Sequence, residues 1–329
     1  MKAVIHYGVS GINGISIQNV KKDKPKPGNV QVRIKAAGLN HRDLFLMKER
    51  KEDLDKPVIP GSDGAGIVEA VGDGVQHIQV GDEVIINPTL NWMHASNVPE
   101  NLEILGIPTD GTFAESAIIP AENVEKKPSF LSWEEAGVLP LAALTAFRAL
   151  FTRGQVRKGE HVLIPGIGGG VATYALTMAK AIGAKVTVTS RSEEKLKHAL
   201  EMGADNAIYS NSDWNKSLKG ELVDLIIDSI GPAVFPKFLS VLRPGGRIVQ
   251  FGRTTGDQVE ISLSLFFRNQ FSFLATSMGS KEEFKDMLHF IEEHRIRPVI
   301  DQVYPLDKAV QAFKRMEEGN QFGNICLKI

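Results

Sequence analysis

Four glycines between residues 166 and 170 stand where a short apolar run meets an amphipathic segment. The apolar run covers residues 162–164, and small or apolar residues follow the glycines at a spacing near 3.6, which is typical of a helix. Gly183 ends this pattern, and residues 185–189 are rich in Val and Thr, which favours a strand. The run therefore predicts a strand, a glycine loop, a helix and a second strand.

A glycine loop in this position can bind a pyrophosphate, because backbone N–H groups and the positive end of the helix dipole meet there. One frame, G-x-x-G-x-x-A, is satisfied and ends at Ala172, whereas the G-x-G-x-x-G frame fails at Val171. A glycine triplet alone is weak evidence, but within a complete βαβ unit it indicates dinucleotide binding rather than a bare structural turn. The candidate phosphate-binding residues are Gly166, Gly168, Gly169, Gly170 and Val171.

The end of the second strand indicates which dinucleotide binds. An NAD-binding unit usually carries Asp or Glu there, which accepts hydrogen bonds from the ribose hydroxyls. This chain has Ser190 and Arg191, with Lys195 one turn along the next helix, so it offers a hydroxyl and two cations to a 2′-phosphate. We therefore predict NADP(H). The alternative is that Ser192 is only the N-cap of that helix and that both cations are solvated.

Composition is that of an ordinary globular protein, with 43% hydrophobic and 23% charged residues in a chain of 329. A formal net charge of −1 gives no indication of a nucleic-acid partner, and no apolar run reaches the length of a membrane span. The single cysteine, Cys326, excludes a disulfide framework and a thiolate metal cluster, and we expect it to be a small buried residue. The predicted location is the cytoplasm.

The order of the predicted elements divides the chain into three parts. Short strand candidates and turn signals fill residues 1–127, which predicts a compact β-rich domain. Strands and helices alternate over 128–275, which predicts a parallel, doubly wound sheet. The last part, 276–329, contains a helix, a strand, a second helix and a terminal strand. Two capping boxes, Ser132–Glu135 and Ser280–Glu283, predict where helices begin.

Several motifs along nearly the whole chain resemble the medium-chain dehydrogenase/reductase superfamily, which includes zinc alcohol dehydrogenases and zinc-free quinone oxidoreductases. They are AAGLNHRDL, PGSDGAGIVEAVGDGV, the GDEV strand, PLAALTAFRAL, the glycine loop and GNQFGNICLKI. The resemblance implies an α/β protein with a Rossmann coenzyme domain over 128–275. It also implies a β-rich GroES-like catalytic domain over 1–127, completed by 276–329, and an active site in the cleft between the two domains.

The zinc ligands of the zinc-type members are replaced in this chain. Asn40 stands where those members carry Cys, Ser62 where they carry His, and Leu141 at the third ligand position. The segment that corresponds to their structural zinc lobe has no cysteine, and we expect its lone His94 to lie at the surface. The resemblance therefore predicts an enzyme without metal at either site.

A site without zinc has no Lewis acid to polarise an alcohol, which favours hydride transfer from NADPH to a quinone or to an α,β-unsaturated carbonyl, an enal or enone. Asn40 is the candidate donor to the substrate oxygen, and Asp43 the candidate that orients it or a water. Both residues are equally compatible with a role in holding a turn. Val58 replaces a tyrosine that some zinc-free relatives carry, which weakly disfavours acyl thioesters.

Further contacts are implied by the resemblance alone, with ordinary strand-end packing as the alternative for each. Thr145 is the candidate contact to the nicotinamide ribose or the substrate, and Asn324 stands where many relatives have Lys. Four residues at strand ends are expected to frame the nicotinamide half: Ser229, Ile230, Phe251 and Gly252.

Two other functions remain as alternatives. One is an alcohol dehydrogenase with an atypical metal arrangement, and the other is a non-catalytic NADPH-binding sensor. We expect a homodimer or homotetramer assembled through an edge strand of the coenzyme sheet, near the apolar run 270–276. The partner is then a small-molecule substrate, with no nucleic acid and no membrane, and both acceptor classes remain open.

Overall fold

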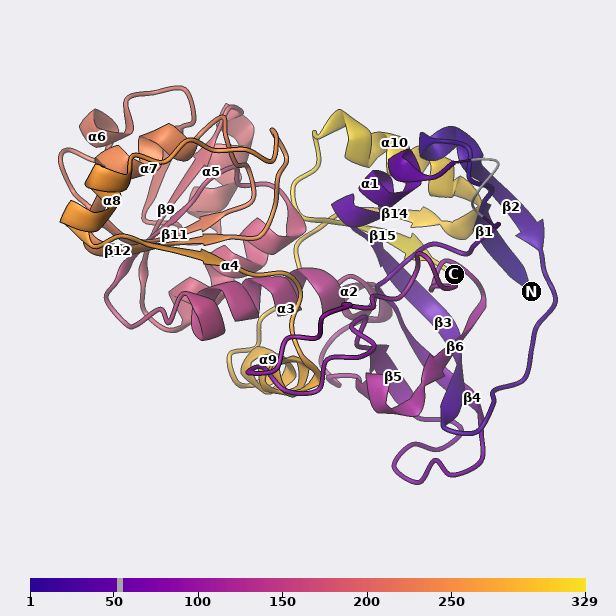
Figure 1. Cartoon of the computed structure of the whole chain (residues 1–329). Coiled ribbons are helices and arrows are strands. Elements are labelled where there is room, and N and C mark those ends of the chain that lie inside the picture. Colours follow the sequence, from indigo (N-terminus) through magenta and orange to yellow (C-terminus); the bar gives the residue numbers. More distant parts are fainter. Residues whose placement is uncertain (52–55) are drawn as a thin grey trace. The chain divides into compact units, whose positions relative to one another are not determined.

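A computed structural model describes residues 1–51 and 56–329, and Figure 1 shows its helices and strands. Contacts within the chain define two compact units. Unit 1 comprises Met1–Ala142 and Gly279–Ile329, and unit 2 comprises Ala143–Met278. The first boundary falls later than residue 127 because the helix Trp133–Gly137 packs on strands of unit 1.

Unit 1 is built on a seven-stranded sheet in which the C-terminal segment pairs with the N-terminal one. The order is β14-β15-β3-β4-β5-β7, with β6 also pairing with β3, and β1 and β2 form a separate antiparallel pair. The strands are β1 Lys2–His6, β2 Ile15–Asn19, β3 Asn29–Leu39, β4 Ala65–Val71, β5 Glu83–Ile86, β6 Ser116–Pro120, β7 Val124–Lys126, β14 Ile300–Pro305 and β15 Asn324–Lys328.

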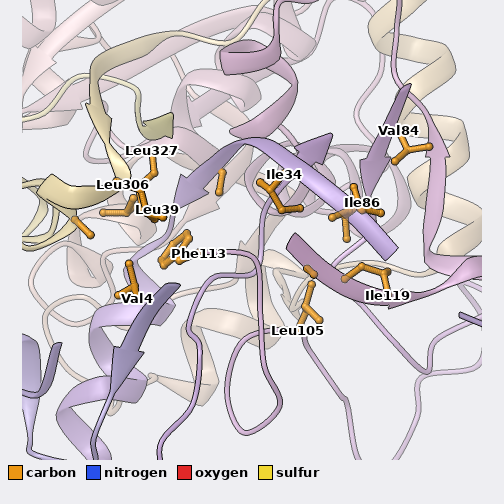
Figure 2. Close-up of a cluster of buried hydrophobic side chains, with 14 of the residues drawn as sticks. Val4, Ile34, Leu39, Val84, Ile86, Leu105, Phe113, Ile119, Leu306 and Leu327 are labelled. Carbon is orange, nitrogen blue, oxygen red and sulfur yellow. The ribbon is translucent and has the colours of Figure 1, made fainter. Parts of the chain in front are cut away.

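The core of unit 1 joins residues far apart in the sequence. Figure 2 shows Leu306 and Leu327, from the last part of the chain, beside Leu39 of β3. Burial of these aliphatic side chains ties the C-terminal segment to the first part of unit 1. Cys326 on β15 is buried, as predicted, and burial raises the pKa of its thiol to about 12.

Both predicted capping boxes are confirmed. The Ser132 hydroxyl accepts a hydrogen bond from Glu135 N, and Ser280 does the same for Glu283 N. The helices of unit 1 are α1 His41–Glu49, α2 Trp133–Gly137, α9 Lys281–Glu293 and α10 Ala309–Glu318, with 3₁₀ turns at Gly11–Gly14, Ala121–Asn123 and Leu306–Lys308. Helix α3, Pro140–Phe147, begins in unit 1 and ends in unit 2.

Unit 2 confirms the predicted doubly wound sheet. Its six strands are all parallel, in the order β10-β9-β8-β11-β12-β13, and Figure 1 shows β11 and β12 side by side. The strands are β8 His161–Ile164, β9 Lys185–Ser190, β10 Asn206–Tyr209, β11 Val223–Asp228, β12 Leu242–Gln250 and β13 Ser272–Ala275. The helical segments are the π-helical turn Arg148–Arg153, α4 Gly170–Ala181, α5 Glu193–Glu201, α6 Trp214–Ser217, α7 Phe235–Val241 and α8 Leu263–Asn269.

The strand order reverses between β8 and β11, and ligands of open parallel sheets bind beyond the carboxyl ends of strands at such a point. The glycine loop follows β8 directly. Residues 229–231 follow β11, which is the strand on the other side of the reversal from β8. The described residues contain no helix long and apolar enough to cross a membrane.

Candidate active site and coenzyme site

Asn40 lies between the end of β3 and the start of α1, and its backbone has the extended conformation of an N-cap. The Asp43 carboxylate accepts a hydrogen bond from Asn40 N at 2.9 Å and so holds the first turn of the helix. Asp43 is buried, and burial raises the pKa of its carboxyl to about 6 although the positive charge of Arg42 acts in the opposite direction. These contacts support the turn interpretation of Asp43, while its part in a reaction stays a prediction.

Asp63, which the sequence analysis did not single out, joins two of the three residues at the zinc-ligand positions. Its Oδ2 accepts a hydrogen bond from Asn40 Nδ2 at 2.8 Å, and its Oδ1 accepts one from the backbone N–H of Leu141 at 2.7 Å. The side chain is buried, and burial raises the pKa of the carboxyl to about 7 against the effect of both hydrogen bonds. One carboxylate therefore fixes the Asn40 amide.

The residue at the remaining ligand position, Ser62, belongs to a second set of hydrogen bonds. Its hydroxyl donates to the carbonyl oxygen of Leu105 at 2.8 Å and accepts from Arg42 Nη1 at 2.6 Å. Arg42 Nη1 also donates to Leu105 O at 3.2 Å. Burial lowers the pKa of Arg42, whereas Asp43 and Asp63 favour its charged form. Arg42 thus places a partly buried cation beside Ser62.

These contacts decide whether zinc fits this position. An amide, a hydroxyl and an aliphatic side chain replace the ligand set, and zinc is bound by thiolate, imidazole or carboxylate groups. Asn40 donates one amide N–H to Asp63, and the Ser62 hydroxyl donates to Leu105 O and accepts from Arg42, so hydrogen bonds within the protein hold both side chains. Over residues 1–51 and 56–329, no group of three or more His, Cys, Asp or Glu side chains is arranged to hold a metal. The residues present do not fit a zinc site.

The segment that corresponds to the structural zinc lobe is held by hydrogen bonds to helix α9. The N–H groups of Lys281 and Glu282 donate to the carbonyl oxygens of Trp92, at 2.7 Å, and Met93, at 3.2 Å. These are first-turn N–H groups, which have no partner within their own helix. The His94 side chain is 72% exposed, as predicted, and its Nδ1 lies 3.8 Å from Glu282 Oε2.

Two predicted contact residues are buried in their own elements. Thr145 lies in α3 and is assigned to unit 2, so it belongs to a different unit from Asn40. Asn324 begins β15 in unit 1, where both its backbone N–H and its Nδ2 donate to Val299 O, at 2.8 and 3.0 Å. The Asn324 geometry is what strand-end packing requires, so its coenzyme contact stays a prediction.

The glycine loop has the backbone that only glycine adopts without strain. Gly166 and Gly168 have φ values of +69° and +133°, and Gly169 is the N-cap of α4. Apart from Gly169 itself, its two chain neighbours and the nearby backbone of its own helix, no atom of the described residues lies within 4 Å of the position that a Cβ on Gly169 would occupy. The start of α4, with Gly170 and Val171 in its first turn, is therefore open to a ligand, and this cradle fits a pyrophosphate.

The predicted nucleotide-selecting residues lie at the end of β9. Ser190 is buried and its hydroxyl accepts a hydrogen bond from Ser192 N at 3.1 Å, which leaves its O–H proton available to a ligand. Arg191 is exposed, and Lys195 lies in the first turn of α5. Ser192 caps α5 by accepting from Lys195 N at 3.4 Å. The capping part of the alternative interpretation is thus correct, and it leaves Ser190 and Arg191 as candidates.

The residues predicted to frame the nicotinamide half follow two adjacent strands. Ser229 and Ile230 come after β11, and Phe251 and Gly252 come after β12. A Cβ on Gly252 would lie 2.9 Å from Ser229 O, so the absence of a side chain allows the two loops to touch. The structure brings these four residues together at the carboxyl ends of β11 and β12, and Ile230 lies against the glycine loop.

Asp228, the last residue of β11, holds the first of these loops and was not singled out from the sequence. Its Oδ1 accepts a hydrogen bond from Ile230 N at 2.8 Å, and its Oδ2 accepts one from Gly231 N at 3.1 Å. The side chain is fully buried, and burial raises the pKa of its carboxyl from 3.8 to about 6, although these hydrogen bonds act to lower it.

This pKa gives a testable dependence of stability on pH. Because the folded protein holds the Asp228 proton more tightly than the unfolded chain, the contribution of Asp228 is most favourable below about pH 4 and is lost as the pH rises through about 6. Asp228→Asn removes the titration. We expect the wild-type free energy of unfolding, relative to the variant, to fall by up to about 3 kcal/mol between these limits. Urea unfolding across this range measures it, and a constant difference would contradict it.

Comparison with known proteins agrees with this geometry. The model of the alcohol dehydrogenase GroES-like domain matches residues 26–129, and the model named zinc-binding dehydrogenase matches residues 170–293. A zinc-type alcohol dehydrogenase-like protein of Schizosaccharomyces pombe is 36% identical over 100% of this chain and 99% of its own. Acryloyl-coenzyme A reductase of Sulfurisphaera tokodaii is 30% identical, with full coverage of both chains.

Two further relatives extend the range of activities. Quinone oxidoreductase of Mus musculus is 30% identical over 97% of this chain and 95% of its own. A crystal structure of an NAD-dependent alcohol dehydrogenase superposes with a TM-score of 0.93, at 34% identity and full coverage of both chains. The parallel sheet with its glycine loop, the GroES-like unit and these matches define an oxidoreductase class. The chain belongs to the medium-chain dehydrogenase/reductase superfamily.

Proposed function

We propose that this chain is a zinc-independent, NADPH-dependent reductase that transfers a hydride to a quinone or to an α,β-unsaturated carbonyl. The observation that carries the proposal is that the residues at the zinc-ligand positions form hydrogen bonds with other groups of the protein. Asn40 and the backbone of Leu141 bind the Asp63 carboxylate, and Ser62 binds Arg42 and Leu105 O. This supports a site that acts by hydrogen bonding instead of by a metal.

The choice of NADPH over NADH rests on the end of β9. Ser190 stands where a carboxylate would repel a 2′-phosphate, and the exposed Arg191 next to it supplies a cation. The alternative is a preference for NADH, because one structural relative is named as NAD-dependent. The two proteins are 34% identical and need not have the same residues at the end of β9. The distinction is a matter of one or two side chains and is directly testable.

The proposed reaction needs little more than positioning and one hydrogen-bond donor. NADPH, when bound, supplies the hydride. An amide nitrogen carries two N–H groups, and the Asn40 amide donates one of them to Asp63. The second N–H remains for the oxygen of a substrate. Because the conjugated carbonyl itself takes up the developing charge, a neutral donor held in place by Asp63 suffices, and the proton can come from solvent.

Both acceptor classes have support among the relatives. One of them is named for quinone reduction and another for reduction of acryloyl-coenzyme A, an α,β-unsaturated thioester. In this chain Val58 forms an isolated bridge with His6, at the position where a tyrosine would supply a phenol. This favours small quinones and enals, and thioesters belong in the comparison as the contrasting class.

Oxidation of NADPH by the purified protein tests the proposal. The acceptors are a simple quinone, a short 2-alkenal and acryloyl-coenzyme A, and the reverse assay uses a primary alcohol with NADP⁺. We expect turnover with the quinone or the alkenal and none with the alcohol. Turnover with the alcohol alone would indicate the alcohol dehydrogenase alternative. Saturable NADPH binding without turnover of any acceptor would indicate the sensor alternative.

We also propose that the chain forms a homodimer through the edge of the sheet in unit 2. No strand within the described residues pairs with the outer edge of β13, and nearby apolar side chains are exposed. Leu263 and Phe267 of α8 are 77% and 62% exposed. Two copies of such an edge can pair with each other, which removes the unpaired backbone groups from solvent.

Light scattering coupled to gel filtration tests the dimer. We expect twice the 36.0 kDa mass of the chain for the wild type and a shift toward one chain for Phe267→Glu, because a buried carboxylate opposes association. Leu200→Glu, at another exposed apolar residue, is the control and should leave the mass unchanged. A monomeric wild type would contradict the proposal.

A further inference from the structure

Side-chain packing and hydrogen bonds connect the loops that follow β8, β11 and β12 to one another. The Ile230 side chain packs on the glycine loop, since a Cβ on Gly166 would lie only 2.5 Å from Ile230 Cδ1. Ile230 belongs to the loop after β11, and this contact links it to the loop after β8. The position of one loop therefore constrains the other.

A second set of contacts links the loop after β11 to the loop after β12. Ser229 O accepts hydrogen bonds from both the N–H and the hydroxyl of Thr254, at 3.2 and 2.9 Å. Ile230 O accepts from both the N–H and the hydroxyl of Thr255, at 3.0 and 2.7 Å. The Thr255 hydroxyl also accepts from Ala233 N at 3.2 Å. Each of the two carbonyl oxygens thus has two donors and is fixed in direction.

The Asp228 carboxylate fixes the N–H side of the same peptides. It accepts from Ile230 N and Gly231 N while its own backbone oxygen accepts from Phe251 N at 3.0 Å. The N–H groups of Ile230 and Gly231 and the carbonyl oxygens of Ser229 and Ile230 therefore all have hydrogen-bond partners. A buried carboxylate that binds two backbone N–H groups is costly to desolvate, so its presence calls for a reason beyond closing a turn.

We propose that Asp228, Thr254 and Thr255 are positioning residues that hold the Ser229–Gly231 loop in the conformation that receives the nicotinamide half of the coenzyme. This inference rests on the proposed function. The adenosine half is selected at the end of β9, where Ser190 and Arg191 lie. The loop after β11 is separated from that strand by β8, so the two halves of the coenzyme depend on different residues.

The test uses this separation. Asp228→Asn keeps one acceptor oxygen but places an NH₂ group against the other backbone N–H, and so releases one end of the loop. We expect the Kd for NADPH to rise about tenfold or more. The Kd for 2′,5′-ADP, which has the 2′-phosphate but no nicotinamide, should stay within about twofold of the wild-type value. Fluorescence titration and calorimetry measure the two constants.

Asp224→Asn is the matched control, because Asp224 lies at the opposite end of the same strand. Its Oδ2 accepts a hydrogen bond from His161 N at 2.7 Å, and it pairs with Arg243. This variant should lower the Tm, yet it should leave both dissociation constants unchanged. Thr255→Val is the second test variant, since it removes a single hydroxyl at the surface and should show the same selective loss for NADPH.

The outcomes separate this inference from the proposed function. Equal weakening of NADPH and 2′,5′-ADP in both test variants, or no weakening in either, would overturn the positioning role. If Asp228→Asn does not fold, Thr255→Val decides alone. If the wild type binds NADH in place of NADPH, the proposed coenzyme choice fails, and the same comparison is made with NADH and AMP. A wild type that binds neither dinucleotide contradicts both.

Discussion

Arg191→Ala is expected to raise the Kd for NADPH by about ten- to a hundredfold and to leave the Kd for NADH unchanged. Each charge-assisted hydrogen bond to the 2′-phosphate contributes about 1.5–3 kcal/mol, and NADH has no such phosphate. The Arg191 side chain is exposed at the end of β9, so its removal should not disturb the fold. Fluorescence titration with both coenzymes measures the change.

Ser190→Asp extends the same prediction. A carboxylate there repels the 2′-phosphate and accepts hydrogen bonds from ribose hydroxyls, so the preference should move toward NADH. Lys197→Ala is the matched control, because Lys197 is an exposed cation, as Arg191 is, but it lies in α5 on a different side of the helix from Lys195. Equal losses of affinity in Arg191→Ala and Lys197→Ala would mean that only net charge matters.

Asn40→Ala is expected to lower kcat about a hundred- to a thousandfold, with a much smaller effect on the Kd for NADPH. This is the size of effect found when one donor to a developing oxyanion is removed. Steady-state kinetics with a quinone and with a 2-alkenal measure it. The substitution also removes the N-cap of α1, which costs about 1 kcal/mol of stability by itself.

Ser280→Ala separates these two effects. It removes the N-cap of α9, another helix of unit 1, and therefore costs a similar amount of stability without touching Asn40 or Asp63. We expect its kcat to equal that of the wild type. If Asn40→Ala also keeps its kcat and loses only stability, Asn40 is a turn residue and the substrate oxygen is bound by another group.

Local patterns predicted much of the fold. The βαβ unit around the glycine loop, the helix starts at Ser132 and Ser280, and the edge strand near residues 270–276 all appear in the structure. Each depends on residues within a few positions of one another, so the sequence pattern carries the information. The sequence analysis does not predict helix α1, because it treats Asn40 and Asp43 as candidates for the site or for holding a turn, whereas together they form the N-terminal cap of this helix.

The parts of the site that the sequence did not predict depend on contacts between distant residues. Asp63 binds Leu141, which is 78 positions further along the chain, and Arg42 contacts Leu105. The proposed role of Asp228 depends on its burial and on its position beside the loop after β12. An aspartate in a motif such as GSDGAG or LIIDSIG indicates a turn, and only the folded structure shows which groups it binds.

The measurement that tests the central claim most directly is the rate of NADPH oxidation before and after metal removal. Protein is treated with a strong chelator, its zinc content is measured, and the rate with the preferred quinone or 2-alkenal is compared with that of untreated protein. We predict far less than one zinc per chain, an unchanged rate, and little turnover with NADH. Loss of activity on chelation that added Zn²⁺ restores would contradict the account.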